Sequence, residues 1–91
     1  MIFMLNKKYV LLYKTLSHPI RVEIICELLS NELGVGDLSR ILGKRQSNVS
    51  QHLQILRRND IVTSNKLGKH RIYKLNDEPR RLFQSLSNLE L

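Results

Sequence analysis

The sequence predicts a mainly α-helical chain with a small β-hairpin, a winged helix-turn-helix in the order α-α-α-α-β-β-α. Three features lead to this fold class. Two helical patterns are joined by a glycine turn, the second of these helices is apolar on one side and polar on the other, and a basic alternating hairpin follows it. The 91 residues fit one domain, spanning 1–91, with no room for a second core.

The distribution of charge indicates a polyanionic partner. The formal net charge is +7, from 15 Lys and Arg against 8 Asp and Glu. The excess is uneven, because residues 40–74 hold nine basic residues and only Asp60 as an acid. A one-sided basic segment of this kind is typical of a surface that binds nucleic acid.

Cys26 is the only cysteine of the chain, which excludes an intramolecular disulfide and a thiolate metal cluster. It also favours a reducing, intracellular setting. The apolar run Met1–Leu5 is too short for a secretion signal or a membrane span. We therefore expect a cytoplasmic protein with no membrane partner.

The first two helices are predicted from the spacing of apolar residues. Residues 5–16 carry apolar side chains three and four positions apart, which predicts an amphipathic helix. Residues 17–19 end it and begin the next helix, with His18 as a cap or turn residue. The second helix is rich in isoleucine and leucine, and we expect Cys26 in its buried core. Its apolar neighbours there are Val22, Ile25 and Leu29.

The helix-turn-helix is predicted over residues 37–58. Asp37 suits the positive end of a short helix, Gly43 supplies the turn, and a longer helix runs from about Gln46 to Arg58. The inward stripe of this longer helix consists of Val49, Leu53 and Leu56.

The wing is predicted over residues 61–75, with strands at 61–65 and 70–75 around a loop. A last helix opens at Pro79 and runs to about residue 90, with one apolar face.

The polar face of the longer helix carries the residues that we predict to read DNA. Amide side chains can pair with adenine through two hydrogen bonds, and hydroxyls can donate or accept at several base edges. The first turns of such a helix reach deepest into the major groove. The predicted recognition residues are Arg45, Gln46, Ser47, Asn48, Ser50, Gln51, His52 and Gln54. Arg45 suits either a guanine or a phosphate, and His52 suits either DNA or packing under the wing.

A second set of basic residues is predicted to contact the DNA backbone or the minor groove beside the wing. This set consists of Lys44, Arg57, Arg58, Lys66, Lys69, His70 and Arg71.

The first and last helices, about 5–16 and 79–90, each have an apolar stripe that so small a core cannot wholly cover. Packing against a second copy would bury both stripes and place two recognition helices roughly 34 Å apart, one turn of DNA. The predicted dimer residues are Tyr9, Leu12, Tyr13, Leu16, Leu82, Phe83, Leu86 and Leu89. The alternative is that these stripes only cover their own core.

Each alternative to sequence-specific DNA binding predicts a different surface on the longer helix or a different set of residues. A merely solvated helix face usually alternates Glu and Lys, which this one does not. An architectural DNA binder needs phosphate contacts alone, and a protein- or RNA-binding module does not need a face of amides and hydroxyls. The sequence shows no nucleophile–base pair, glycine-rich phosphate loop or paired carboxylates that would indicate an enzyme.

Several segments together resemble the ArsR/SmtB family of winged-helix repressors. They are Leu16–Arg21, Glu32–Leu38 and Gln46–Leu53, with the end of the wing at Arg71–Leu75. The resemblance covers about residues 10–80. It implies a homodimer joined through the first and last helices, a repressor that binds an imperfect palindromic operator, and release from DNA when an inducer binds.

The chain departs from this family at its known switches. Many members bind metal through Cys-Val-Cys where this chain has Gly34–Gly36, and others use Asp and His on the last helix. That helix holds acidic residues here but no histidine, and carboxylates alone make a poor zinc site. We predict no metal and no other cofactor. Redox-sensing members use two cysteines within one subunit, so Cys26 is either plain core or a reactive or intersubunit thiol. The sequence identifies no inducer.

Overall fold

The structure, a computed structural model, describes the backbone of residues 7–87 and the side chains of residues 10 and 12–86. Its elements confirm the predicted winged helix-turn-helix and add one short strand, β1. In chain order they are α1 (Lys7–Thr15), α2 (Pro19–Ser30), β1 (Leu33–Gly34), α3 (Val35–Leu42), α4 (Gln46–Arg58), β2 (Val62–Leu67), β3 (His70–Leu75) and α5 (Asp77–Ser87).

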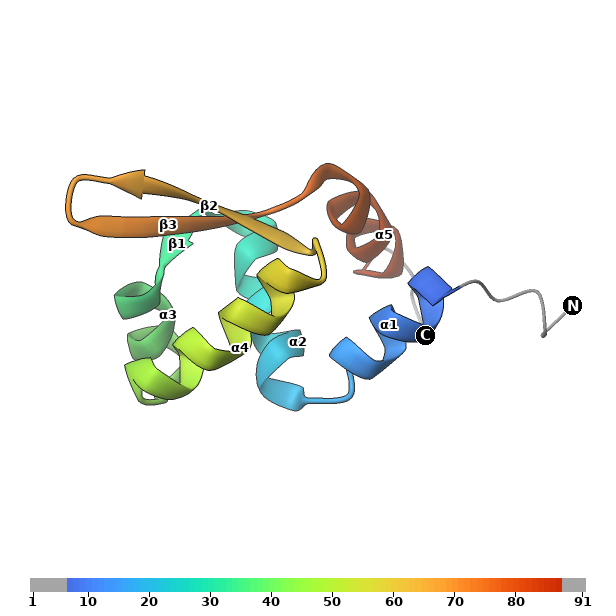
Figure 1. Cartoon of the computed structure of the whole chain (residues 1–91), viewed down its shortest axis with the longest axis horizontal. Coiled ribbons are helices and arrows are strands. Elements are labelled where there is room, and N and C mark those ends of the chain that lie inside the picture. Colours follow the sequence, from blue (N-terminus) through green and yellow to red (C-terminus); the bar gives the residue numbers. More distant parts are fainter. Residues whose placement is uncertain (1–6, 88–91) are drawn as a thin grey trace, which may run out of the picture.

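Figure 1 shows α1 and α5 at one end of the molecule and the loop of the wing at the other end. α3 and α4 form the helix-turn-helix, and α2 packs against α3, α4 and α5. None of the helices within residues 7–87 combines the length and apolar character that a membrane crossing needs.

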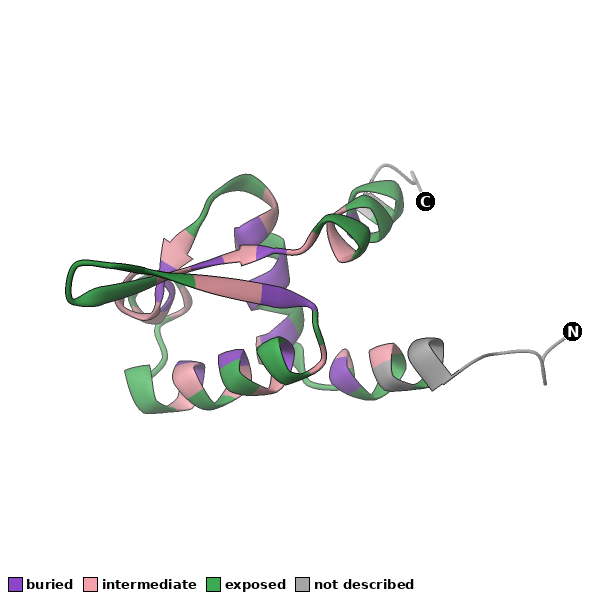
Figure 2. Cartoon of the chain, turned by 45° about the horizontal axis from the view of Figure 1, so that its top comes forward, coloured by how far each residue is buried: buried purple, intermediate pink, exposed green. Residues whose placement is uncertain are grey.

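The core forms where α4 turns one side toward α2 and the sheet. Val49, Leu53 and Leu56 are fully buried, which confirms the predicted stripe. The other buried members of the same cluster are Ile24, Ile25, Leu28, Leu38, Ile61, Val62, Tyr73, Leu75 and Phe83. Figure 2 shows buried positions along the inner side of α4 and exposed ones around the wing loop. Because a helix has 3.6 residues per turn, burial of this stripe decides which side of α4 faces solvent.

The sheet is antiparallel throughout, in the order β1-β3-β2. The sequence predicts no strand between the second and third helices, whereas Leu33 and Gly34 pair with Tyr73 and Ile72 of β3. A two-residue strand carries no periodicity of its own, so only its pairing partner reveals it. Gly34 is buried, and an added Cβ would lie 3.2 Å from the carbonyl oxygen of Arg71. Glycine therefore allows the two strands to approach.

α3 begins at Val35, two residues before its predicted start at Asp37. The Asp37 carboxylate accepts hydrogen bonds from the backbone N–H of Gly34 at 3.0 Å and from the Arg40 guanidinium at 2.8 Å. The bond from Gly34 is the largest cause that lowers the pKa of Asp37. An acid that reaches back in this way lies at the third helical position, so it marks the first turn rather than the first residue.

The wing and the last helix also differ from their predicted limits. β2 runs on to Leu67, which leaves Gly68 and Lys69 as the turn, with Gly68 at a φ of 63°. A two-residue hairpin turn requires such left-handed backbone. α5 begins at Asp77, because the N–H of Arg80 already donates to the carbonyl oxygen of Asn76 at 2.9 Å. Pro79 therefore lies in the first turn, where an N–H needs no partner.

Gly43 ends α3 in the left-handed conformation, with a φ of 65° and a ψ of 36°. An added Cβ would meet nothing within 4 Å, so an alanine here costs backbone strain alone. We expect Gly43→Ala to lower the free energy of unfolding by about 1 kcal/mol in urea denaturation.

The matched control is Gly36→Ala, inside α3. There the nearest atom to an added Cβ is the Gln46 amide nitrogen at 3.7 Å, an ordinary contact, and the backbone is not left-handed. Alanine is the better helix former, so this variant should unfold at the same or a higher urea concentration than wild type. An equal loss of stability in both variants would contradict the backbone explanation.

Candidate nucleic-acid interface

The outward side of α4 carries most of the residues predicted to read DNA. Gln46, Ser47, Gln51 and Gln54 are exposed, and Asn48 and Ser50 are half-buried. Ser47, Gln51 and Gln54 lie on the side of the helix opposite the buried stripe, and Gln46, Asn48 and Ser50 flank it. Within the described residues these six side chains make no hydrogen bond to the rest of the chain. Their donors and acceptors are therefore open to a ligand, as base edges in a major groove require.

The start of α4 is open to an anion. Arg45 holds the N-cap position without a side-chain hydrogen bond, and the first turn has no acidic residue. The first N–H groups of a helix carry a partial positive charge. Lys44 and Arg45 beside them are exposed. This end of α4 suits a phosphate group.

The last turn of α4 carries Arg57 and Arg58, both exposed. Cations there also complement the negative end of the helix, so their position has a structural reason as well.

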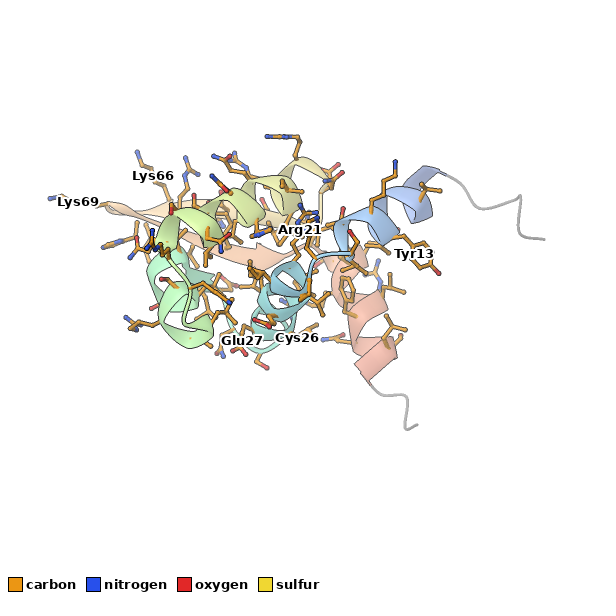
Figure 3. All side chains as sticks on the ribbon, turned by 90° about the horizontal axis from the view of Figure 1, so that it is seen from below. Tyr13, Arg21, Cys26, Glu27, Lys66 and Lys69 are labelled. Carbon is orange, nitrogen blue, oxygen red and sulfur yellow. The ribbon has the colours of Figure 1, made fainter. Side chains whose placement is uncertain are left out.

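The wing presents its basic residues at its free end. Lys66, Lys69 and His70 are exposed, and Figure 3 shows Lys66 and Lys69 projecting at the tip of the hairpin. Arg71 differs, because its Nη1 donates to the Ser64 hydroxyl at 3.1 Å across the hairpin. The sequence predicts no role for Leu67, which lies among these cations with 67% of its surface exposed.

His52 makes contacts with α2 and with His18 that the sequence did not predict. It is half-buried on the flank of α4, and its Nδ1 accepts a hydrogen bond from Nε of Arg21, on α2, at 3.1 Å. Its ring also lies 5.8 Å from the ring of His18, centroid to centroid. Desolvation, followed by Arg21 and then His18, lowers the pKa of His52.

Arg21 is the structural residue that sequence reasoning missed. It is buried, with 8% of its surface exposed. A signal was present, since Arg21 is in helical phase with Ile24, Ile25 and Leu28, which are buried toward α4. A cationic side chain on the buried side of a helix needs hydrogen-bond acceptors for its N–H groups.

Cys26 is exposed, so its prediction as buried core is wrong. α2 carries apolar residues on two sides. The side with Arg21 and Ile24 faces the core, whereas the side with Val22 and Cys26 does not. Figure 3 shows Cys26 and Glu27 on the side of α2 away from α4. An apolar groove of about 320 Å³ runs beside Cys26 and is lined also by Leu16, Val22, Ile25, Leu29, Phe83 and Leu86.

The predicted dimer residues divide into three groups. Tyr13, Leu82 and Leu86 are exposed on α1 and α5, with exposed fractions of 72%, 36% and 51%. Leu12 and Leu16 are partly buried against the core. The prediction that Phe83 is left uncovered by its own core is wrong, because this side chain lies in the core with only 9% of its surface exposed. The side chain of Tyr9, and Leu89, lie outside the described residues.

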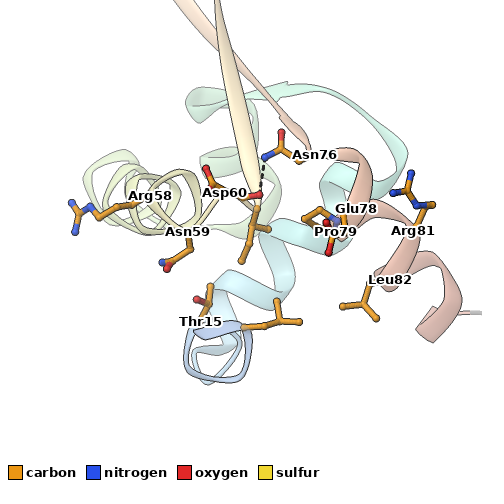
Figure 4. Close-up of a pocket in the computed structure, with 11 residues that line it drawn as sticks. Thr15, Arg58, Asn59, Asp60, Asn76, Glu78, Pro79, Arg81 and Leu82 are labelled. Carbon is orange, nitrogen blue, oxygen red and sulfur yellow. Dashed lines mark hydrogen bonds between the residues drawn. The ribbon is translucent and has the colours of Figure 1, made fainter. Parts of the chain in front are cut away.

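A cavity of about 900 Å³ separates α1 from α5 (Figure 4). Leu12 stands on its α1 wall and Leu82 on its α5 wall. The turn after α4 forms a third wall, held by a hydrogen bond of 2.7 Å from the Asn76 amide to the Asp60 carbonyl oxygen. Of the two apolar stripes, Leu12 and Leu82 line this cavity, whereas Leu16, Phe83 and Leu86 line the groove beside Cys26.

Within residues 7–87 no three His, Cys, Asp or Glu side chains gather closely enough to hold a metal ion. Gly34 and Gly36 have no side-chain ligand atom.

A helix-turn-helix that turns an open polar face outward, beside a basic wing, defines a winged-helix DNA-binding protein. Residues 18–64 match the family described as "Bacterial regulatory protein, arsR family". The chain belongs to this family, which consists of DNA-binding transcriptional regulators and not of enzymes.

Two relatives give the extent of the similarity. The transcriptional activator HlyU of Vibrio cholerae is 40% identical over 85 residues, which are 92% of this chain and 79% of HlyU. A biofilm growth-associated repressor of Xylella fastidiosa is 39% identical over 66 residues, or 72% of this chain and 58% of the repressor. The chain thus spans little more than half of that repressor's length.

Solved structures agree with the fold. HlyU of Vibrio cholerae superposes with a TM-score of 0.83 at 38% identity, over 90% of this chain and 94% of that one. The repressor BigR of Xylella fastidiosa superposes with a TM-score of 0.78 at 32% identity, over 92% and 89%. A winged-helix domain of Mycobacterium bovis that is described as homodimeric reaches 0.82 at 22% identity, over 88% and 75%, a likeness of fold alone.

The titration of His52 can be measured directly. Because burial and two neighbouring groups lower its pKa, the imidazole should titrate below its usual value of 6.5 in an NMR titration. As the pH falls below about 6.5, the unfolded chain takes up this proton before the folded chain does. The contribution of His52 to the free energy of unfolding is therefore fully present above that pH and is lost as the pH falls below it. In Arg21→Met the pKa of His52 should rise, and an unchanged value would contradict the contact.

Proposed function

We propose that the chain is a sequence-specific transcriptional repressor that binds a palindromic operator as a homodimer in the cytoplasm. The observation that supports this most is the open polar face of α4, opposite the fully buried stripe of Val49, Leu53 and Leu56. A helix held in this rotation can enter a major groove with amides and hydroxyls toward the bases and its apolar side on the protein core.

Base and phosphate contacts fall on different parts of this surface. Gln46, Ser47, Asn48, Ser50 and Gln51 lie in the first two turns of α4, which reach deepest into the groove. Lys44 and Arg45 at the start of α4, and the two arginines at its end, suit the phosphates on either side. We assign Arg45 to a phosphate, because it adjoins the uncapped helix N-terminus. The wing cations suit the neighbouring backbone or minor groove.

A second copy of the chain is proposed to cover the end formed by α1 and α5. Tyr13 and Leu86 are largely exposed there. Two hollows lie at this end, the cavity between Leu12 and Leu82 and the apolar groove beside Cys26. The free end of the wing lies far from it (Figure 1), so dimer contact and DNA contact do not compete.

Two alternatives remain as outcomes of the test. An architectural DNA binder would use the cations alone, and a protein- or RNA-binding module would retain no duplex. The relatives are named as a repressor and as an activator, so the direction of regulation is decided by a promoter–reporter assay.

The first experiment is selection of genomic and random duplex fragments on the purified protein at about 150 mM salt, followed by sequencing of the bound pool. We expect a palindrome with half-sites about one helical turn apart. A bound pool without sequence preference would favour the architectural binder, and no retained duplex would favour a protein or RNA partner.

Removal of the amides tests base reading. On the selected palindrome, Gln46→Ala and Asn48→Ala should each weaken binding by about 1–3 kcal/mol, while binding to random duplex stays unchanged. Fluorescence anisotropy measures both affinities. Asn31→Ala, which removes an exposed amide beyond the end of α2, should change neither. Harmless Gln46 and Asn48 variants would rule out direct reading by these residues.

Leu86→Glu tests the dimer. A carboxylate on the apolar end of α5 cannot be buried against a second copy, so we expect monomers in sedimentation analysis and much weaker operator binding. Ile41→Glu is the matched control, since Ile41 has the same exposed fraction, 51%, but lies on α3. It should leave the oligomeric state of the wild type unchanged. A dimer in both variants would exclude this surface.

A further inference from the structure

Arg21 is a buried cation at a junction of three elements. It lies in the first turn of α2, where its Nε donates to His52 Nδ1 on α4 at 3.1 Å and its Nη1 donates to the carbonyl oxygen of Thr15 in α1 at 3.3 Å. Figure 3 shows Arg21 between α4 and α1. A guanidinium is rarely buried unless its donors find partners, and here those partners belong to the recognition helix and to a proposed dimer helix.

This contact decides the state of His52. Nε of Arg21 carries a hydrogen and can only donate, so Nδ1 of His52 must offer a lone pair. The neutral imidazole therefore holds its hydrogen on Nε2. His52 is half-buried on the flank of α4, next to the fully buried Leu53. The Arg21 contact thus joins α4 to α2 by a directional bond, beside apolar packing that has no such direction.

α2 is held in the same way at its other end. Arg80 of α5 donates to the carbonyl oxygens of Leu28 and Leu29 at 3.3 Å and 3.0 Å. Charge-assisted hydrogen bonds therefore join α2 to α5 at its C-terminus and to α1 and α4 at its N-terminus. The two proposed dimer helices and the recognition helix are all anchored on this one helix.

We infer that Arg21 is a positioning residue for DNA recognition, which acts through Nδ1 of His52 to hold α4 in a fixed orientation relative to α1. The inference rests on the proposed role of α4 in reading DNA. It assigns His52 an inward task in place of a contact to a base. Loss of this bond leaves the surface of α4 chemically intact, so it weakens recognition of the operator and spares phosphate binding.

Two substitutions of His52 separate the inward task from a direct DNA contact. The oxygen of an asparagine lies as many bonds from Cα as Nδ1 does, so His52→Asn can still accept from Arg21 but has no group at the Nε2 position. A glutamine amide reaches the Nε2 position and leaves the Nδ1 position empty. Affinities for the selected palindrome and for random duplex are measured for both variants, with unfolding curves to correct for folded fraction.

We expect His52→Asn to bind the palindrome as wild type does, and His52→Gln to bind it about tenfold more weakly, with random duplex bound equally by all three. The opposite order would show that Nε2 touches DNA and would overturn the inference. Equal binding of the palindrome by both variants, or parallel loss on both duplexes, would overturn it as well.

A double-mutant cycle gives a second measurement. Arg21→Met should weaken palindrome binding at least as much as His52→Gln does, since it also removes the bond to Thr15. Adding His52→Gln to Arg21→Met should weaken binding no further, because both break the Arg21–His52 bond. If Arg21→Met fails to fold, the two His52 variants decide alone. A wild type without sequence preference would overturn the proposed function itself, whereas a wild type and His52→Gln with the same preference would overturn only the role of Arg21.

Discussion

Burial of Val49, Leu53 and Leu56 against α2 and the sheet is the constraint on which the rest of the structure depends. These three side chains leave α4 a single rotation about its axis, because any other would expose them or bury amides without partners. The outward direction of Ser47, Gln51 and Gln54 follows from that rotation. The face that can read DNA is thus positioned by the hydrophobic core and not by contacts of its own.

α2 connects this face to the other end of the molecule. The helix is apolar on both sides, so one side packs on α4 while the other is left beside an apolar groove at Cys26. Arg21 and Arg80 then fix its two ends by hydrogen bonds to α1, α4 and α5. A movement of α1 or α5 relative to the core would act on α4 through these bonds. In the proposed dimer, that arrangement would offer a physical route from the contact between the two copies to the spacing of their recognition helices.

The lack of a side chain at Gly34, which leaves no metal ligand there, also has a structural effect. Gly34 is where β1 approaches β3, and its missing side chain leaves room for the Arg71 carbonyl. In this chain the segment therefore serves strand pairing and the start of α3, where Asp37 reaches back to the Gly34 N–H. Strand pairing and this hydrogen bond hold the segment between α2 and α3 to the rest of the fold.

The sequence by itself determined the order of the main elements, the limits Gln46 and Arg58 of α4, and the two faces of that helix. Strong periodicity and glycine turns are local signals, so one chain segment suffices to read them. It failed at Cys26, because the apolar surface of α2 is so wide that its sequence does not reveal which part will be covered. It also missed β1 and the bond between Arg21 and His52, which lie 31 residues apart. Only the tertiary structure decided these features, because each depends on which distant segment packs against which side of α2 or β3.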